Sequence, residues 1–228
     1  MDTATRRAFL RTSAGLLVAG AAPLVAKKRS ASDWVKLGTS GVKVTRLAFG
    51  TGTYSGRVQR ELGQEGFNRL VRYAYDHGIR FFETADAYPN MPTMLGIALK
   101  GLPRDSYRVM TKFRTADANR NQRETIDRLR RELQMDYVDI MLIHCVRRTS
   151  WVEDYCRLRD TLSDAKDRKI IRAHGASCHG LLPLRRFPDT RWLDVALLRV
   201  NHNGTKMDNL RGEDGKPGDV AEVTSHIS

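Results

Sequence analysis

RFFETADAY, from Arg80 to Tyr88, is the stretch that decides the fold, because an apolar run here ends in residues capable of acid–base chemistry. Two later stretches have the same form: MTKF contains Lys112, and VDIMLIHC contains His144. A carboxylate at Glu83, a phenol, an ammonium and an imidazole therefore follow successive strand-like runs. Reactive residues at the carboxyl ends of parallel strands meet at one edge of a sheet. We expect Glu83, Tyr88, Lys112 and His144 to form one site.

Around this stretch, short strand-like runs alternate with helical ones from Val35 onward. VKLGTSGVKV predicts a hairpin with its turn at residues 39–41, and a strand then ends at Gly50. QEGFNRLVRYAYDHG predicts a helix that ends at Gly78 and has one apolar face, formed by Phe67, Leu70, Val71, Ala74 and Tyr75. Further strands are predicted in IRFFE, YRVMTK, YVDIMLIH, KIIRAHGAS and LDVALLRV, and further helices in TMLGIALKG, in NQRETIDRLRREL and from Trp151.

Alternating strands and helices with short connections predict an α/β fold with a parallel sheet. An open doubly wound sheet and a (β/α)8 TIM barrel both satisfy this pattern. The first strand–helix turn, GTGTYSG, lacks the GxGxxG spacing of a dinucleotide-binding turn, and the reactive residues come from several strand ends, which favours the barrel. We predict an incomplete TIM barrel over residues 30–228, with an N-terminal β-hairpin, about six of eight strand–helix units, and truncation before strands 7 and 8.

The pieces GTGT, FFETADAY, TKF, LIHC and GASCH, in this order, resemble the aldo/keto reductase family from about Val35 to Asn203. The resemblance implies a TIM barrel that uses NADP(H) to reduce a small-molecule carbonyl, an aldehyde or a ketone, to an alcohol by hydride transfer. It makes Tyr88 the general acid, Lys112 its partner and His144 the active-site histidine. Glu83 stands where the family has an aspartate.

Elementary chemistry agrees with these roles. Reduction places negative charge on the carbonyl oxygen, so a proton donor is needed within about 3 Å of it. A free tyrosine, with a pKa of about 10, is a weak acid near neutral pH. We therefore expect the Lys112 ammonium to lower the pKa of Tyr88. Glu83 would hold Lys112 in place, although its extra methylene requires the carboxylate to retract or the lysine to shift.

The resemblance also implies cofactor contacts from Gly50, Thr51, Gly52, Ser177 and Cys178. A serine–asparagine pair after the fifth strand of the family contacts the nicotinamide amide, and that pair is Ser177-Cys178 here. The family's clamp for the adenosine phosphate follows its last strand, which this chain does not include. Two alternatives therefore stay open: a reductase, or a non-catalytic remnant or binding scaffold of the same fold that does not retain NADP(H).

Residues 1–29 form a separate segment. TRRAFLR carries the pair Arg6 and Arg7, and a 13-residue apolar run from Ala14 to Ala26 follows. This run is shorter than the roughly 18 residues that indicate a membrane span. The segment resembles a twin-arginine export signal, which implies synthesis in the cytoplasm, recognition by the twin-arginine export machinery and a periplasmic protein without a stable membrane span. An amphipathic or disordered start is the alternative.

Charge and cysteine content narrow the remaining classes. The net charge is +13, but basic and acidic residues are interspersed, as in RETIDRLRREL, and the chain has no zinc-finger or RNP-type motif, so we predict no nucleic-acid partner. The 3 cysteines imply no disulfide framework, although a Cys145–Cys178 bridge stays open. Adjacent pairs at His144-Cys145 and Cys178-His179 do not suit one metal ion, so we predict no metal site. Asp86 is interpreted as a loop carboxylate.

Overall fold

The computed structural model of the protein describes residues 28–200 and His202. The chain divides into two units, Met1–Ser30 and Ala31–Ser228, and the helices and strands reported below all lie in the second. Nearly all of the predicted export segment, residues 1–29, lies outside the described residues. Within the described part of the chain, no helix is long and apolar enough to cross a membrane.

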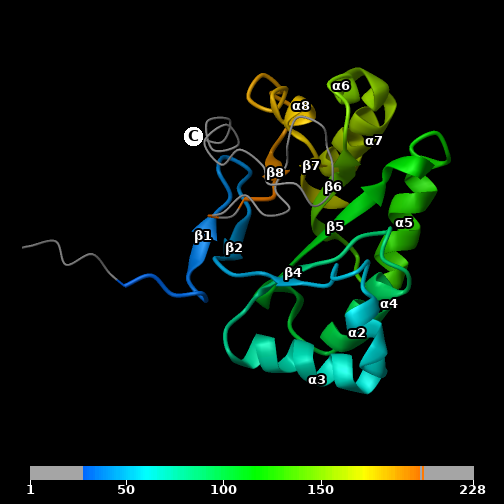
Figure 1. Ribbon diagram of the computed structural model, residues 1–228. Coiled ribbons are helices and arrows are strands. Elements are labelled where there is room, and N and C mark those ends of the chain that lie inside the picture. Colours follow the sequence, from blue (N-terminus) through cyan, green and yellow to red (C-terminus); the bar gives the residue numbers. More distant parts are fainter. Residues whose placement is uncertain (1–27, 201, 203–228) are drawn as a thin grey trace, which may run out of the picture. The chain divides into compact units, whose positions relative to one another are not determined.

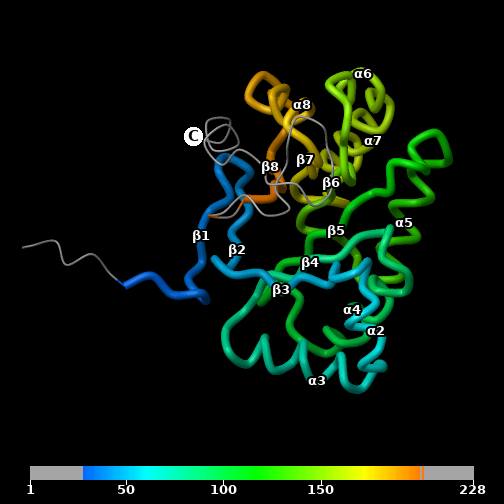
Figure 2. Tube along the Cα trace, viewed as in Figure 1, coloured from blue at the N-terminus to red at the C-terminus, as the bar shows by residue number. Residues whose placement is uncertain are grey.

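Six parallel strands form one sheet in which neighbours in space are also neighbours in sequence (Figure 1 and Figure 2). Each pairing between adjacent strands is parallel, so the strands follow one another as a half-barrel. This confirms the predicted α/β fold of TIM-barrel type. The strands are β3 (Phe49–Gly50), β4 (Phe81–Glu83), β5 (Arg108–Arg114), β6 (Val138–Val146), β7 (Ile171–Cys178) and β8 (Val195–Leu197).

The predicted N-terminal hairpin is also confirmed. It consists of β1 (Trp34–Lys36) and β2 (Lys43–Thr45), which pair antiparallel. Gly41 has a φ of +76°, a left-handed conformation that glycine adopts without steric cost, and it lies in the turn between the two strands. Val42 and Val44 are buried, so the hairpin adds apolar side chains to the core of the fold.

Helices follow the strands and lie along the outer side of the sheet (Figure 1). The predicted helix from Trp151 is interrupted at Tyr155 and forms two helices. The helices are α2 (Arg57–Glu61), α3 (Gly63–Asp76), α4 (Met91–Leu99), α5 (Gln122–Glu132), α6 (Trp151–Asp154), α7 (Cys156–Asp167) and α8 (Leu181–Leu184), with 3₁₀ turns at Arg104–Ser106 and Thr115–Asp117.

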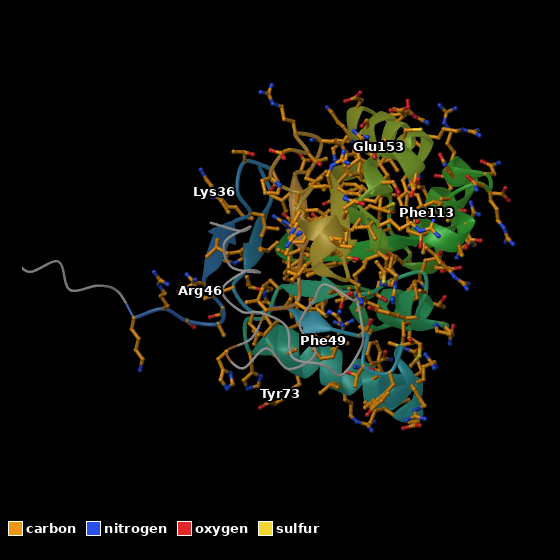
Figure 3. All side chains as sticks on the ribbon, turned by 45° about the horizontal axis from the view of Figure 1, so that its top comes forward. Lys36, Arg46, Phe49, Tyr73, Phe113 and Glu153 are labelled. Carbon is orange, nitrogen blue, oxygen red and sulfur yellow. The ribbon has the colours of Figure 1, made fainter. Side chains whose placement is uncertain are left out.

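The apolar face of α3 is narrower than predicted. Phe67 and Val71 are fully buried, whereas Leu70 is 41% exposed. Tyr73 projects from the helix into solvent (Figure 3) and is 63% exposed. Gly78 follows the end of α3 with a φ of +87°, which confirms the predicted glycine stop.

Two apolar clusters pack on opposite faces of the sheet. The outer cluster joins strand residues such as Phe82 and Phe113 to the helices, and it contains most of the buried apolar side chains. The interior cluster is smaller and consists of Val42, Val44, Phe81, Met110, Ile140, Leu142, Ala173 and Val195. Successive side chains in a strand point to opposite faces, so adjacent residues such as Phe81 and Phe82 belong to different clusters.

A buried ionic network lies where the strands begin. Asp139, the second residue of β6, is fully buried, and its carboxylate lies 2.7 Å from Arg104 Nη2 and 3.2 Å from Arg172 Nη1. Arg108 Nε lies 3.6 Å from the same carboxylate. The guanidiniums of Arg104 and Arg172 also contact the ring of Tyr137, at 4.0 and 4.2 Å from its centroid. This network joins the starts of β5, β6 and β7 at the end of the sheet opposite the predicted site.

Candidate active site

The alternation of side chains places three predicted residues on one face of the sheet. The interior cluster takes Phe81 from β4, Met110 from β5 and Leu142 from β6. The residues two places further along these strands are Glu83, Lys112 and His144. Because residues two apart share a face, the three side chains lie beyond the interior cluster, at the carboxyl end of the strands. Residues far apart in the sequence therefore meet here.

Lys112 is the centre of the contacts and is only 2% exposed. Its Nζ forms an ion pair with Glu83 Oε1. The same amine donates to the backbone oxygen of Thr84 at 3.1 Å and to Tyr88 Oη at 3.3 Å. These partners account for all three donors of an ammonium group. Glu83 therefore reaches the lysine in spite of its additional methylene.

The phenol of Tyr88 is enclosed by three neighbours. Its ring meets the His144 ring edge to face, with centroids 5.7 Å apart and an interplanar angle of 85°. Lys112 Nζ lies 4.9 Å from the Tyr88 ring centroid. On another side is the backbone of Gly52, where an added Cβ would lie 2.7 Å from Tyr88 Oη. The phenolic oxygen is thus held between a lysine, a histidine and a glycine backbone.

Burial determines the protonation of the site. It raises the pKa of Tyr88 above 10.0, with a smaller contribution from Cys145. It lowers the pKa of Lys112 to about 7, against an opposing effect of Cys145. It also lowers the pKa of His144 to about 3, assisted by the positive charge of Lys112 and by His179. At neutral pH the phenol is therefore protonated and the imidazole is neutral.

One expectation about the electrostatics is wrong. The neighbouring lysine predicted a lowered pKa for Tyr88, but in this structure the pKa of Tyr88 is raised. Removing the phenol from water disfavours the phenolate and is the largest cause of the raised pKa. Burial also lowers the pKa of Lys112 to about 7, so the lysine is a weaker cation than the sequence suggests. The sequence shows that a charged residue is near Tyr88 but not how deeply the phenol is buried, and burial decides the direction of the pKa shift here.

The residues expected to contact a cofactor divide into two groups. Gly50, Gly52 and Ser177 lie beside the reactive side chains: a Cβ on Gly50 would lie 3.3 Å from Glu83 Oε2, and Ser177 points to the inner face. Thr51 is fully buried, and its backbone N–H donates to the backbone carbonyl oxygen of Glu83 at 3.0 Å. Cys178 belongs to the outer cluster. Its thiol therefore faces the helices, one residue beyond the inward-facing serine.

Cys145 is a feature of the site that the sequence patterns did not reveal. It has a φ of +60°, which is uncommon for a residue other than glycine. The pairing of β6 with β7 shifts register between Ile143 and Val146, around this residue. The Cys145 N–H donates to Ser177 Oγ at 2.8 Å, which fixes the distorted strand end. No disulfide joins Cys145 to Cys178 in this structure, so the alternative of a bridge between them is not formed.

The other polar candidates have structural partners or no shared site. Asp86 lies 2.8 Å from Arg128 and so ties its loop to α5, in agreement with its interpretation as a loop carboxylate. His174 is stacked on Trp192, with ring centroids 4.3 Å apart. Among residues 28–200 and 202, no group of three histidine, cysteine or acidic side chains is placed to hold a metal ion.

Solved structures resemble this fold. A putative aldo-keto reductase from Pseudomonas aeruginosa is 22% identical, with a TM-score of 0.61 over 72% of this chain and 66% of the other. An aldo-keto reductase from Klebsiella pneumoniae, solved in complex with NADPH, is 21% identical, with a TM-score of 0.55 over 72% of this chain and 57% of the other. At these identities the likeness establishes the fold.

Sequence comparison identifies relatives. A probable aldo-keto reductase 1 from Glycine max is 45% identical over 35% of this chain and 23% of its own length. L-galactose dehydrogenase from Arabidopsis thaliana is 36% identical over 48% of this chain and 36% of its own. The matches thus cover about a third or less of these curated relatives. The sequence profile of the aldo/keto reductase family matches residues 46–212, which include all the site residues described above. The chain belongs to the aldo/keto reductase family.

Proposed function

We propose that this chain catalyses the NADP(H)-dependent reduction of an aldehyde or ketone to an alcohol, with Tyr88 as the general acid. The observation that carries the proposal is the position of Lys112 Nζ, which contacts Glu83 and lies 3.3 Å from Tyr88 Oη. A buried lysine between a carboxylate and a phenol can stabilise the negative charge that forms on the phenol oxygen when the phenol gives up its proton.

The protonation states suit this role. Tyr88 is protonated at neutral pH, because burial raises its pKa, and so it has a proton to give to a carbonyl oxygen. As the phenol gives up that proton, the Lys112 amine stabilises the phenolate through the existing contact. His144 is neutral, with a pKa lowered to about 3, so it orients the substrate oxygen by a neutral hydrogen bond. General acid catalysis of this kind contributes about 10²–10⁴-fold to the rate.

Residues beside the site fit a nicotinamide cofactor, which supplies the hydride when it is bound. Gly50 and Gly52 carry no side chain where the backbone approaches Glu83 and Tyr88, and a Cβ on either would make a tight contact. Ser177 points to the same face as His144. We therefore assign the cofactor contacts to Gly50, Gly52 and Ser177, and assign Thr51 and Cys178 to packing.

Substitution of the tyrosine tests the proposal. Tyr88→Phe should lower kcat by at least about 10²-fold, because the proton donor is lost while the ring remains. Tyr73→Phe is the matched control, since Tyr73 is 63% exposed on α3. Equal turnover in Tyr88→Phe and the parent would rule out the assigned acid. If NADPH titration of the parent gives no fluorescence change at millimolar cofactor, the alternative of a non-catalytic scaffold is the correct one.

We propose in addition that residues 1–29 direct export by the twin-arginine pathway to the periplasm. The pair Arg6 and Arg7 followed by a short apolar run supports this. Replacing both arginines with lysine should retain the protein in the cytoplasm of a bacterial host. Unchanged periplasmic recovery of that variant would contradict export by this route.

A further inference from the structure

A cavity next to the candidate centre has features of a substrate subsite. It has a volume of about 350 Å³ and lies beside α6 and the loops that follow β5 and β6. This volume is within the range of about 300–1,000 Å³ found for small-molecule sites. Its lining includes Cys145, Arg147, Arg148, Trp151 and Tyr155.

Cys145 connects this cavity to the reactive groups. It lines the cavity and directly follows His144 in β6. Its backbone N–H donates to Ser177 Oγ at 2.8 Å, and His144, the preceding residue, meets the ring of Tyr88 edge to face. The cavity therefore lies one residue along β6 from the histidine that contacts Tyr88, and a molecule bound there could extend toward Tyr88.

The charge at the cavity is positive. Arg147 and Arg148 are both exposed, and neither forms an ion pair with any residue that the structure describes. One carboxylate, Asp154, also lines the cavity, and it accepts a hydrogen bond from Ser150 Oγ at 2.8 Å. Two guanidiniums beside one carboxylate leave an excess positive charge. Guanidinium groups bind carboxylates and phosphates through paired, charge-assisted hydrogen bonds.

Trp151 adds a donor without an acceptor. Its side chain is fully buried and packs near Phe187, with ring centroids 5.4 Å apart. Trp151 also lines the cavity, and its Nε1 has no hydrogen-bond partner within the described part of the chain. A buried N–H without an acceptor is uncommon in native proteins. An acceptor oxygen in the cavity would satisfy this group.

We infer that this cavity is the subsite for an anionic group, and that the substrates are carbonyl compounds carrying a carboxylate or a phosphate. Arg147 and Arg148 bind the anion, and Trp151 and Tyr155 form the wall against the carbon skeleton. The inference rests on the proposed reductase function and adds the substrate class to it.

Matched substrate pairs test the assignment. The first pair is 4-carboxybenzaldehyde and its neutral analogue methyl 4-formylbenzoate, which lacks the carboxylate charge. The second pair is glyceraldehyde 3-phosphate and glyceraldehyde, which lacks the phosphate. The parent should prefer the anionic member in kcat/KM by about tenfold or more, the lower range for hydrogen bonds to charged groups. The double variant Arg147→Gln, Arg148→Gln should lose most of that preference. Arg157→Gln, an exposed residue of α7, should retain it.

The pair of aldehydes that shows the preference identifies the anion as carboxylate or phosphate. If the ratio of kcat/KM between the anionic and the neutral aldehyde is the same in the parent and the double variant, the subsite is overturned and the reductase function is left intact. If no aldehyde is reduced, the reductase function fails, and calorimetric titration with 4-carboxybenzaldehyde then decides the subsite. Binding that weakens about tenfold in the double variant supports it, whereas no binding to the parent at millimolar concentration overturns it.

Discussion

Gly52→Ala should displace the Tyr88 phenol, the proposed acid, without removing any polar group. The added Cβ would lie 2.7 Å from Tyr88 Oη and 2.8 Å from Cζ, whereas ordinary contact begins at 3.4 Å, so about 0.7 Å must be gained by movement. The hydrogen bond from Lys112 to Tyr88 is already long, at 3.3 Å, so a further displacement of the phenol would break it. Because a misplacement of about 1 Å can reduce catalysis about 10²-fold, we expect kcat to fall roughly 10–10²-fold.

Steady-state kinetics with separate kcat and KM values, together with urea unfolding, measure this effect. Overpacking should also lower the free energy of unfolding by about 1–3 kcal/mol. Thr53→Ala is the matched control, because Thr53 is an exposed residue of the same loop. A Gly52→Ala protein that is folded and keeps kcat within about threefold of the parent would refute the idea that this close approach positions Tyr88.

Three further predictions concern stability. Gly175→Ala should lower the free energy of unfolding by more than about 3 kcal/mol, because the new Cβ would lie 1.8 Å from the backbone oxygen of Val195; an unchanged urea midpoint would contradict the close β7–β8 approach. Asp139→Asn should cost about 2 kcal/mol, because it removes the charge of a fully buried carboxylate that pairs with three partly exposed arginines, and a loss below about 0.5 kcal/mol would show that the network is dispensable. The pKa of His144 is lowered to about 3 in the folded chain, so its contribution to stability is present above pH 6.5 and is lost as the pH falls toward 3. The lowering of the His144 pKa from 6.5 to about 3, converted at 1.36 kcal/mol per pKa unit and discounted for partial exposure, corresponds to a stability contribution on the order of 3 kcal/mol. Urea unfolding of His144→Asn at pH 7 and pH 4 should show a correspondingly smaller acid sensitivity than the parent, and equal sensitivity would contradict it.

Much of the fold could be predicted from the sequence because the strands are short, apolar and bounded by polar residues. The six parallel strands and the hairpin followed from these runs. The width of a helix face could not be predicted in the same way. Leu70 fits the apolar spacing of α3 but is exposed, because Phe67 and Val71 already fill the contact with the sheet. The break at Tyr155 likewise has no glycine or proline to announce it.

The candidate site was predictable where its residues stand at strand ends. Glu83, Tyr88 and Lys112 come together as the sequence indicated. The direction of the Tyr88 pKa was not predictable, because it depends on burial from groups distant in the chain. The left-handed backbone of Cys145 carries no sequence signal, since glycine or asparagine is the usual residue in that conformation.

The alternation of faces along β5, β6 and β7 has a consequence for altering this protein. Inward residues form the interior cluster and the candidate site, and their immediate neighbours pack against the helices. Randomising only Ser177 and other inward positions, or the loop arginines, would therefore explore new specificities while leaving the helix-packed layer untouched. A single-residue insertion within β6, by contrast, would exchange the two layers beyond that point. The chain should thus tolerate many substitutions at inward positions and almost no insertions within these strands.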